Sequence, residues 1–437
     1  MNKKDAIIMD GALYIEGDRI IDVGTTARLA KEHGPEDTID AKGKIVMPGF
    51  VNCHSHSVAS LVRGLGADMY LFDWMKKLKL PYYTAMRESD AYNGSLLSYV
   101  ENIKNGCTCI VDHYYPSREN KKNVDSIAQA ALDSGVRAAI ARTYHEEGEK
   151  VSEIFIESRD EILGEYRRII RKWNGRGQGR LMTWLGPDNL LFSTLETIKE
   201  THLLASANGV GMHCHLSETV EMDNMIRKKF GKGSIEVFYD LGVLDPKFQA
   251  AHLVIISDRE IELLAKTGAS AINNIVTNTF LADGVSPVTK MLRAGVNVAL
   301  GTDATGTYGT QDMFLSMKFA AAIHKLNAMD PTAITAKDVL RMATRNGARA
   351  LGLQDEIGSI EIGKKADVIL VDTRKPHITP FHDITAAIVY LSRSDDVDTT
   401  IVDGKVLMKN REMVGIDELS VMEKAAKSSE SLIRRMS

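Results

Sequence analysis

The sequence predicts an α/β protein, a (β/α)8 TIM barrel with a small composite β-sandwich domain built from both chain ends. Short apolar runs alternate with helix-length amphipathic segments through the middle of the chain. Strand-and-turn patterns occupy the two ends. A chain of 437 residues, 44% of them hydrophobic, is long enough to bury one large core and one smaller core.

The two chain ends share one pattern of short alternating strands. Near the N-terminus, "ALYIEGDRIIDVG" predicts two strands around a turn at Glu16, Gly17 and Asp18. The pattern returns in "GSIEIGKKADVILVD" and "TTIVDGKVLMKN". Each end is too small to bury a core alone. We therefore expect residues 1–47 and 359–437 to form one sandwich, with a C-terminal helix, around a barrel of residues 48–358.

Eight apolar runs are candidate barrel strands. The segments between them, such as "NVDSIAQAALDSG" and "SDREIELLAKTG", begin with Asn or Ser and end with Gly, which is typical of capped helices. Eight strands, each followed by a helical connection, predict the barrel. The runs span residues 50–56, 108–115, 137–144, 180–186, 209–216, 249–256, 270–275 and 296–303.

Composition limits the partners and the compartment. A net charge of -4 gives no electrostatic reason to expect nucleic acid or an anionic membrane as a partner. No apolar run is long enough to span a bilayer, and the N-terminus lacks the pattern of a secretory signal. The four cysteines lie in apolar runs, as reduced thiols do in cytoplasmic proteins. We expect a cytoplasmic homo-oligomer that acts on a small molecule.

Reactive side chains gather at the ends of the predicted strands. In "CHSH", His54 and His56 are two residues apart, so a strand points both imidazoles to one side. Taken alone, such a pair is more commonly a pair of ordinary hydrogen-bonded histidines. The fifth run, however, ends in His213 and His215, and the eighth ends at Asp303. Strand ends carry the active face of such barrels.

These residues suit a single metal ion. The candidate ligands are the carboxylate of Asp303 and three imidazoles, those of His54, His56 and one of the two histidines of the fifth run. This set suits Zn²⁺ with an open position for water, and Fe²⁺ is an alternative. Metal-activated water supplies hydroxide as a nucleophile. Glu218 is placed to carry a proton, and His252 to orient water or polarise substrate. As alternatives, His252 could be a core histidine and Asp303 a helix cap.

The motifs resemble the amidohydrolase superfamily, in its branch of purine, methylthioadenosine/S-adenosylhomocysteine and triazine deaminases and chlorohydrolases. The similar segments include "PGFVNCHSH", "HCHLSET", "PVTKMLRAGVNVALGTD" and "GSIEIGKKADVILVD". The resemblance implies a composite β-sandwich and a mononuclear site, because "RLMTWLGPDN" lacks the lysine of two-metal members. It also implies that Glu218 is the proton shuttle, that His252 orients the water, and that the metal ligands are His54, His56, His215 and Asp303.

Three substrate positions depart from the adenosine-type pattern of that branch. Asp188 stands where those deaminases have the histidine of "GPH", and Asn273 begins a segment that is usually "HNP". Tyr83 stands where a glutamate binds ribose hydroxyls. These departures argue against an adenosine-like ligand. A carboxylate at position 188 would favour amino or cationic groups, whereas Asn273 would suit an amide-like ring edge. Either side chain could instead cap a loop.

Further substrate contacts are predicted at Trp74, His113 and Arg142. Arg142 could bind a carbonyl or carboxylate, or could pair with a nearby acid such as Glu146. Residues 68–83 are rich in aromatic side chains and form a candidate lid, although aromatic stripes more commonly pack in a core.

The sequence therefore predicts a mononuclear zinc-dependent deaminase of an aminopurine, pterin, pyrimidine or triazine. One alternative keeps the metal site but removes chloride or an alkylamine, or opens a cyclic amide. A second alternative, from another class, is a non-catalytic ligand-binding barrel.

Overall fold

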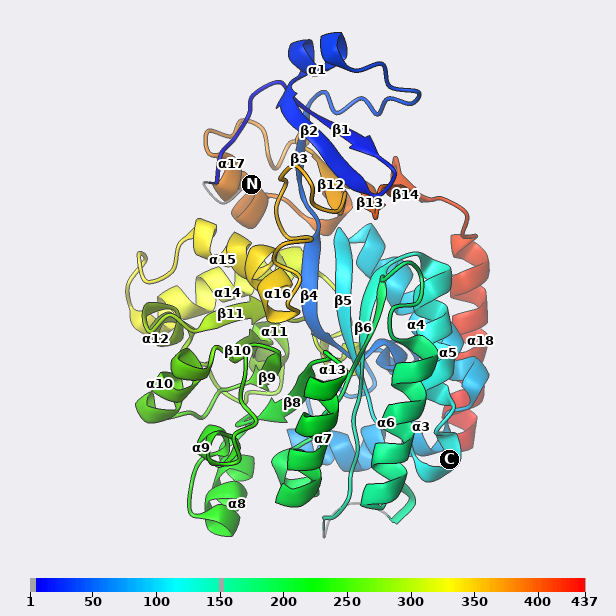
Figure 1. The fold of residues 1–437 in the computed structure, drawn as a ribbon, viewed down its shortest axis with the longest axis vertical. Coiled ribbons are helices and arrows are strands. Elements are labelled where there is room, and N and C mark those ends of the chain that lie inside the picture. Colours follow the sequence, from blue (N-terminus) through cyan, green and yellow to red (C-terminus); the bar gives the residue numbers. More distant parts are fainter. Residues whose placement is uncertain (1–4, 149–152, 437) are drawn as a thin grey trace.

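The computed structural model describes residues 5–148 and 153–436. At its centre, strands run parallel to one another and are surrounded by helices (Figure 1). They coincide with the eight predicted runs and confirm the barrel. In chain order they are β4 (Phe50–Ser55), β5 (Cys107–Tyr114), β6 (Arg137–Arg142), β7 (Leu181–Trp184), β8 (Met212–Leu216), β9 (Phe248–His252), β10 (Ser270–Asn273) and β11 (Asn297–Leu300).

The eight strands form two four-stranded sheets that meet at both edges. The hydrogen-bonded orders are β4-β5-β6-β7 and β11-β10-β9-β8. Parallel bridges join Leu185 to Met212 at one junction and Ser55 to Asp303 at the other. The sheets therefore close into a ring whose carboxyl ends point the same way, as a TIM barrel requires.

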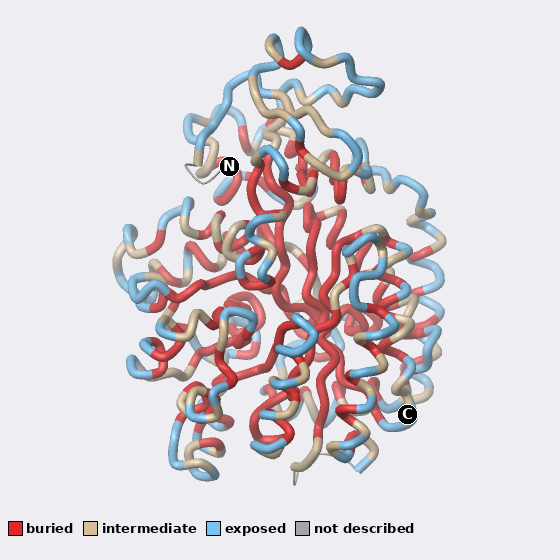
Figure 2. Tube along the Cα trace, viewed as in Figure 1, coloured by how far each residue is buried: buried red, intermediate tan, exposed pale blue. Residues whose placement is uncertain are grey.

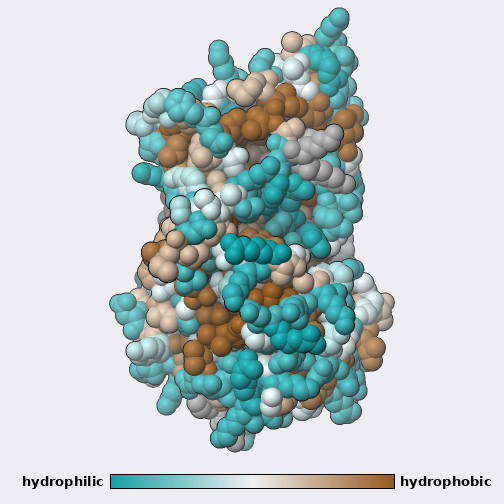
Figure 3. Space-filling view, turned by 90° about the vertical axis from the view of Figure 1, so that its left-hand side faces the viewer, coloured by the Kyte–Doolittle hydropathy of each residue, from teal (hydrophilic) through white to brown (hydrophobic). Residues whose placement is uncertain are grey.

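The strands are buried on both faces (Figure 2). One apolar cluster, which includes Val51, Cys53, Val111 and Ile272, draws on strands from around the ring and fills its interior. A larger cluster packs the outer strand faces against the helices. All four cysteines are buried and free, in agreement with the prediction of reduced thiols. One face of the surface mixes hydrophilic and apolar side chains (Figure 3).

The helices begin and end where the sequence signals them. At α10 (Asp258–Thr267), Ser257 and Glu260 form a capping box, and Gly268 adopts the left-handed conformation that ends the helix. The other long barrel helices are α4 (Glu88–Lys104), α5 (Asn123–Ser134), α6 (Arg159–Trp173), α7 (Leu195–Ala207), α8 (Val220–Phe230) and α14 (Met313–Ala328). The shorter helices are α1 (Thr26–Glu32), α2 (Leu71–Trp74), α3 (Leu80–Ala85), α9 (Ser234–Asp240), α11 (Ile275–Phe280), α12 (Val288–Arg293), α13 (Thr305–Tyr308), α15 (Ala336–Met342), α16 (Arg345–Ala350) and α17 (Ile384–Ala386).

Both chain ends contribute to one sheet, as expected. Strand β3 (Lys44–Pro48) pairs antiparallel with β12 (Val368–Asp372), in the order β15-β14-β13-β12-β3. A hairpin covers this sheet, and residues from both layers, among them Ile20, Val368 and Ile401, form a separate core. The remaining strands are β13 (Val397–Val402), β14 (Lys405–Lys409), β15 (Glu412–Met413) and the hairpin strands β1 (Gly11–Glu16) and β2 (Arg19–Thr25).

The last helix, α18 (Glu418–Met436), lies along the barrel rather than the sandwich (Figure 1). Arg435 forms an ion pair with Asp90 of α4 and donates to the Ala85 carbonyl at the end of α3. No helix among the described residues has the length and apolar character needed to cross a bilayer.

A buried ion cluster joins the barrel to the composite sheet. Arg137, at the start of β6, donates to both carboxylate oxygens of Asp367 at 3.0 and 3.1 Å and to Asp403 at 2.8 Å. All three side chains are nearly inaccessible to solvent. Removing one member of such a cluster leaves the other charges buried without compensation.

We predict that Arg137→Met lowers the free energy of unfolding by about 3–5 kcal/mol. Urea denaturation measures the change. The control is Lys77→Met, which removes an exposed ion pair with Asp73 and should cost less than about 1 kcal/mol. A loss at Arg137 no larger than the loss in this control would contradict the assigned role of the cluster.

Candidate metal centre and active site

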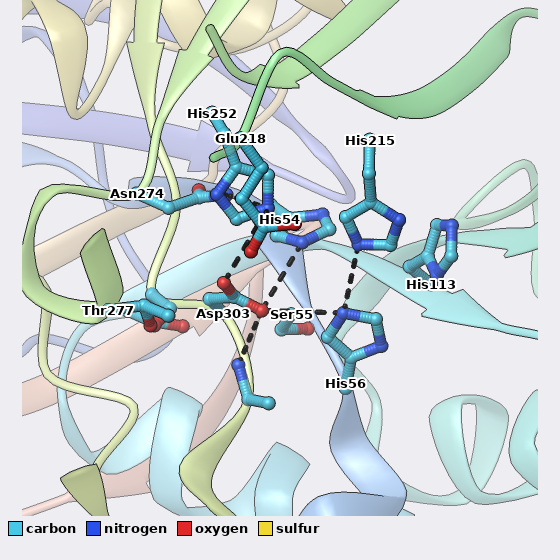
Figure 4. A network of polar contacts seen from close by, with 12 residues as sticks. His54, Ser55, His56, His113, His215, Glu218, His252, Asn274, Thr277 and Asp303 are labelled. Carbon is cyan, nitrogen blue, oxygen red and sulfur yellow. Dashed lines mark hydrogen bonds and ion pairs between the residues drawn. The ribbon is translucent and has the colours of Figure 1, made fainter. Parts of the chain in front are cut away.

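Four side chains converge at the carboxyl ends of the strands (Figure 4). Nε2 of His54 and Nε2 of His56 each lie 3.3 Å from Oδ1 of Asp303, and Nε2 of His215 lies 3.4 Å from Nε2 of His56. Metal–ligand bonds of about 2.0–2.1 Å in a tetrahedron place neighbouring ligand atoms about 3.3 Å apart. The spacing of the four donors therefore fits one divalent metal ion.

A chain of hydrogen bonds fixes the tautomer of His54. Its Nδ1 lies 2.8 Å from Nε2 of His213, whose Nδ1 lies 2.9 Å from Oε1 of Gln249. Because the amide oxygen only accepts, His213 donates from Nδ1 and accepts from His54 at Nε2. The buried Nε2 of His54 has no hydrogen-bond partner, so its lone pair is available to a metal ion. Of the two histidines of the fifth run, His213 supports the cluster and His215 enters it.

Asp188 fixes His215 in the same way. Nδ1 of His215 lies 2.9 Å from the Asp188 carbonyl oxygen and 3.1 Å from its Oδ1, so this nitrogen donates and Nε2 faces the cluster. His145 lies 2.9 Å from the other carboxylate oxygen. Burial acts to raise the pKa of Asp188, but the charge of Lys79 and the bonds from His145 and His215 hold that pKa well below its usual value.

Two further side chains face the open side of the cluster. His252 Nε2 lies 3.7 Å from Glu218 and 3.8 Å from Asp303, while its Nδ1 lies 2.9 Å from Oδ1 of Asn278 and donates to it. His252 and Asp303 both have positive φ angles, 76° and 65°. Such conformations cost about 1–3 kcal/mol each and cluster at functional sites. Asp303 does not cap a helix, since Asp312 is the N-cap of α14.

Burial lowers the pKa of His54 and of His56, whereas the contact with Asp188 raises the pKa of His215 against the effect of burial. Desolvation lowers the pKa of His54 well below its usual value, so its ring is neutral at physiological pH. Burial acts to raise the pKa of Asp303, but the imidazoles of His54 and His56, each with Nε2 3.3 Å from Oδ1, hold the pKa of that carboxyl well below its ordinary range. Neutral imidazoles and an ionised carboxylate are the ligand forms that metal binding needs.

Beside the cluster lies a cavity that contains some of the predicted substrate residues. Trp74 and Asp188 line it, together with Glu218 and His252. His113 packs its ring 4.2 Å from the His215 ring and 4.9 Å from the His56 ring, behind the cluster. Trp74 belongs to the predicted lid segment, which covers the cavity through α2 and the following π-helical turn, Met75–Lys79.

The structure does not bring three other predicted residues to this cavity. Tyr83 is fully buried and stacks on Tyr115 at 4.5 Å. Arg142 is also fully buried and donates to both carboxylate oxygens of Glu157 at 2.7 Å, so its partner is neither a ligand nor Glu146. Asn273 points away from the ring interior, and its Oδ1 lies 3.2 Å from His324 of α14. Because side chains alternate along a strand, the next residue faces inward instead.

That next residue is Asn274, whose Nδ2 lies 3.4 Å from Nε2 of His252. Sequence reasoning missed it, although the pattern of β10 contained the signal.

Lys79 was also missed. It lies in the charged run "MKKLK", which resembles an exposed helix face, but the π-helical turn rotates Lys79 into the cavity wall, 5% exposed.

Residues 45–407 match the model of the Amidohydrolase family. The chain belongs to the amidohydrolase family. A 5'-deoxyadenosine deaminase of Methanosarcina barkeri is 37% identical over 437 residues, which cover 100% of this chain and 96% of the relative. A 5-methylthioadenosine/S-adenosylhomocysteine deaminase of Thermoanaerobacter pseudethanolicus is 36% identical over 435 residues, 100% of this chain and 97% of the relative.

Among solved structures, a zinc-bound adenosine deaminase of Xanthomonas campestris superposes with a TM-score of 0.92 at 27% identity, covering 98% of this chain and 95% of that one. Family membership and these relatives confirm the predicted superfamily and the composite fold. The protein is a hydrolase that acts on carbon–nitrogen bonds other than peptide bonds.

We predict that His213→Leu lowers metal affinity about 10–100-fold, because the variant removes the acceptor that orients His54. Competition with a chromophoric zinc chelator measures the affinity. The control, His382→Leu, replaces a histidine that is exposed on the composite domain and should leave affinity unchanged. Equal affinity in the two variants would show that His213 does not orient the ligand.

Proposed function

We propose that this amidohydrolase is a mononuclear zinc-dependent deaminase of a small nitrogen heterocycle. The observation that carries the proposal is the convergence of His54, His56, His215 and Asp303 beside Glu218 and His252. The zinc bound in the Xanthomonas relative and the deaminase names of the full-length relatives support it. A zinc ion held by these four ligands would lower the pKa of water and supply hydroxide near neutral pH.

The residues around this cluster have distinct roles in the proposal. Glu218 takes a proton from the attacking water and delivers it to the departing amino group, since it lies within reach of the open side. His252, held by Asn278, presents Nε2 toward the same space and orients the water. Asn274 Nδ2 contacts the His252 ring and helps to fix its position. Burial of all these groups excludes bulk water and strengthens their electrostatic effect.

The substrate is proposed to be an aminopurine or a related aminated ring. The full-length relatives are named for adenosine derivatives, which makes a 6-aminopurine the first compound to test. Two features of this chain weigh against a ribose-dependent substrate. Tyr83 presents no carboxylate and is buried behind Tyr115, and Asp188 is bonded to histidines. The free base and its oxygenated analogues are therefore preferred to the nucleoside.

The experiment is ammonia release by zinc-loaded protein from a panel of aminopurines, pterins, aminopyrimidines, aminotriazines and adenosine derivatives. Ammonia release from a free base supports the proposal in full. Ammonia release from a nucleoside alone would change the proposed substrate class from free bases to nucleosides. Mass analysis of the products distinguishes deamination from loss of chloride or alkylamine and from ring opening. No reaction of any compound would overturn the proposal.

We predict that Glu218→Gln lowers kcat about 10²–10⁴-fold and retains one metal ion per chain, because the variant removes the proton carrier and leaves the four ligands intact. Steady-state kinetics and elemental analysis of the same preparation measure the two quantities. Glu262→Gln, on the exposed face of α10, is the matched control. Unchanged turnover in Glu218→Gln would remove Glu218 from the mechanism.

A further inference from the structure

The cavity that Glu218 and His252 line also has a buried cation in its wall. Lys79 ends the π-helical turn Met75–Lys79 and is 5% exposed. It lines the same cavity as His56 and His215, together with Trp74 and Asp188. A lysine buried to this extent is rare unless its charge is compensated.

Within the described ranges, 5–148 and 153–436, the ammonium of Lys79 has no hydrogen-bond acceptor and no carboxylate at ion-pair distance. Its contacts are aromatic. Nζ lies 4.7 Å from the centre of the Tyr115 ring and 5.6 Å from the centre of the Trp74 ring. Cation–π contacts hold the chain of Lys79 in place, but they satisfy none of its three N–H donors. These donors face the cavity.

Asp188 lines the same cavity, but among the described residues its carboxylate oxygens contact imidazoles and not the Lys79 ammonium. One lies 2.9 Å from His145 and the other 3.1 Å from His215. The charge of Lys79 acts on Asp188 and on the two cluster histidines His56 and His215, so the ammonium lies close to the metal ligands without contacting a carboxylate. A molecule that enters the cavity can therefore supply the acceptor that Lys79 lacks.

We propose that Lys79 is a specificity-determining residue that binds an oxygen acceptor, a ring oxo group or a carboxylate, on the heterocyclic substrate. The inference rests on the proposed function for the identity of the ring, and it adds the polar group that the ring must carry. Because Lys79 and Trp74 line the same cavity as the cluster, a ring whose amino-bearing carbon lies at the cluster has another edge available to these two side chains. An ammonium donates and cannot accept, so it favours an oxygen over an amino group or C–H at that edge.

The test compares ligands that differ only at one carbon. The first series is adenine, isoguanine and 6-aminopurine-2-carboxylate, which carry hydrogen, oxo and carboxylate at the same position. A second pair, 2-aminopurine and guanine, repeats the comparison with the amino and oxo positions exchanged. Calorimetry on zinc-loaded protein measures Kd, and steady-state kinetics measures KM and kcat wherever turnover occurs. Because binding is measured without turnover, this test stands even if deamination fails.

We expect the protein to bind an oxygen-bearing ring about 10–100-fold more tightly than the matching ring without oxygen. This is the gain in affinity that one hydrogen bond to a charged group contributes. Lys79→Met should abolish that preference by raising the Kd and KM of the oxygen-bearing rings. The variant should leave the binding of adenine and 2-aminopurine unchanged. Lys79→Arg, which keeps a charged donor, should retain part of the preference. The relative effects of oxo and carboxylate identify which oxygen group is recognised.

The matched control is Lys76→Met, on the exposed side of the same helical turn, which should keep the wild-type preference. Two results would overturn the proposal. One is that the wild-type protein binds oxygenated rings no more tightly than unoxygenated rings, or binds none of the rings. The other is an equal loss for every ligand in Lys79→Met, which would show that Lys79 only packs against Trp74 and Tyr115.

Discussion

One backbone hydrogen bond links the closure of the barrel to its chemistry. The N–H of Asp303 donates to the carbonyl of His54 at 2.8 Å, and this bond belongs to the bridge that joins β11 to β4. The contact that closes the ring therefore also places the Asp303 carboxylate between two imidazoles. Asp303 accepts a positive φ there, at a cost that a packed barrel can support. The geometry of the candidate metal centre thus depends on the same hydrogen bond that closes the ring.

The two sides of the cavity are built differently. Strand ends supply the cluster residues, whose tautomers are fixed by donors and acceptors within the barrel, such as His213 and Gln249. The opposite wall comes from the π-helical turn after α2 and from aromatic side chains, including Trp74. A connection between elements can change its residues without disturbing the ring. If the cluster carries the chemistry and the wall the selectivity, as we propose, a change on the wall would alter the preferred ligand and leave the cluster intact.

The sequence contained enough to predict the fold and the cluster, because both depend on local pattern. Eight apolar runs and the caps between them specify the barrel, and histidines at strand ends must meet when the strands close. The wall could not be predicted in the same way. Alternation along β10 separates Asn273 from Asn274, and a one-residue uncertainty in a strand reverses which of them faces inward. Arg142 was predicted to contact the substrate, but it donates to Glu157, which lies fifteen residues away in a connection whose path no periodicity encodes.

The role predicted for Asp188 changes once the side chains around it are known. From the sequence, a carboxylate in the pocket suggested recognition of an amino or cationic group. In the structure, both carboxylate oxygens face imidazoles, and one of those rings belongs to the metal cluster. Asp188 therefore contacts one ring of the cluster and one outside it, although its buried Oδ1 has no hydrogen-bond partner of regular geometry among the described residues. Lys79 lines the same cavity, has no hydrogen-bond acceptor among the described residues and only donates. In our proposal the preferred polarity of the ligand is therefore reversed, because Lys79 rather than Asp188 contacts it and binds an acceptor group.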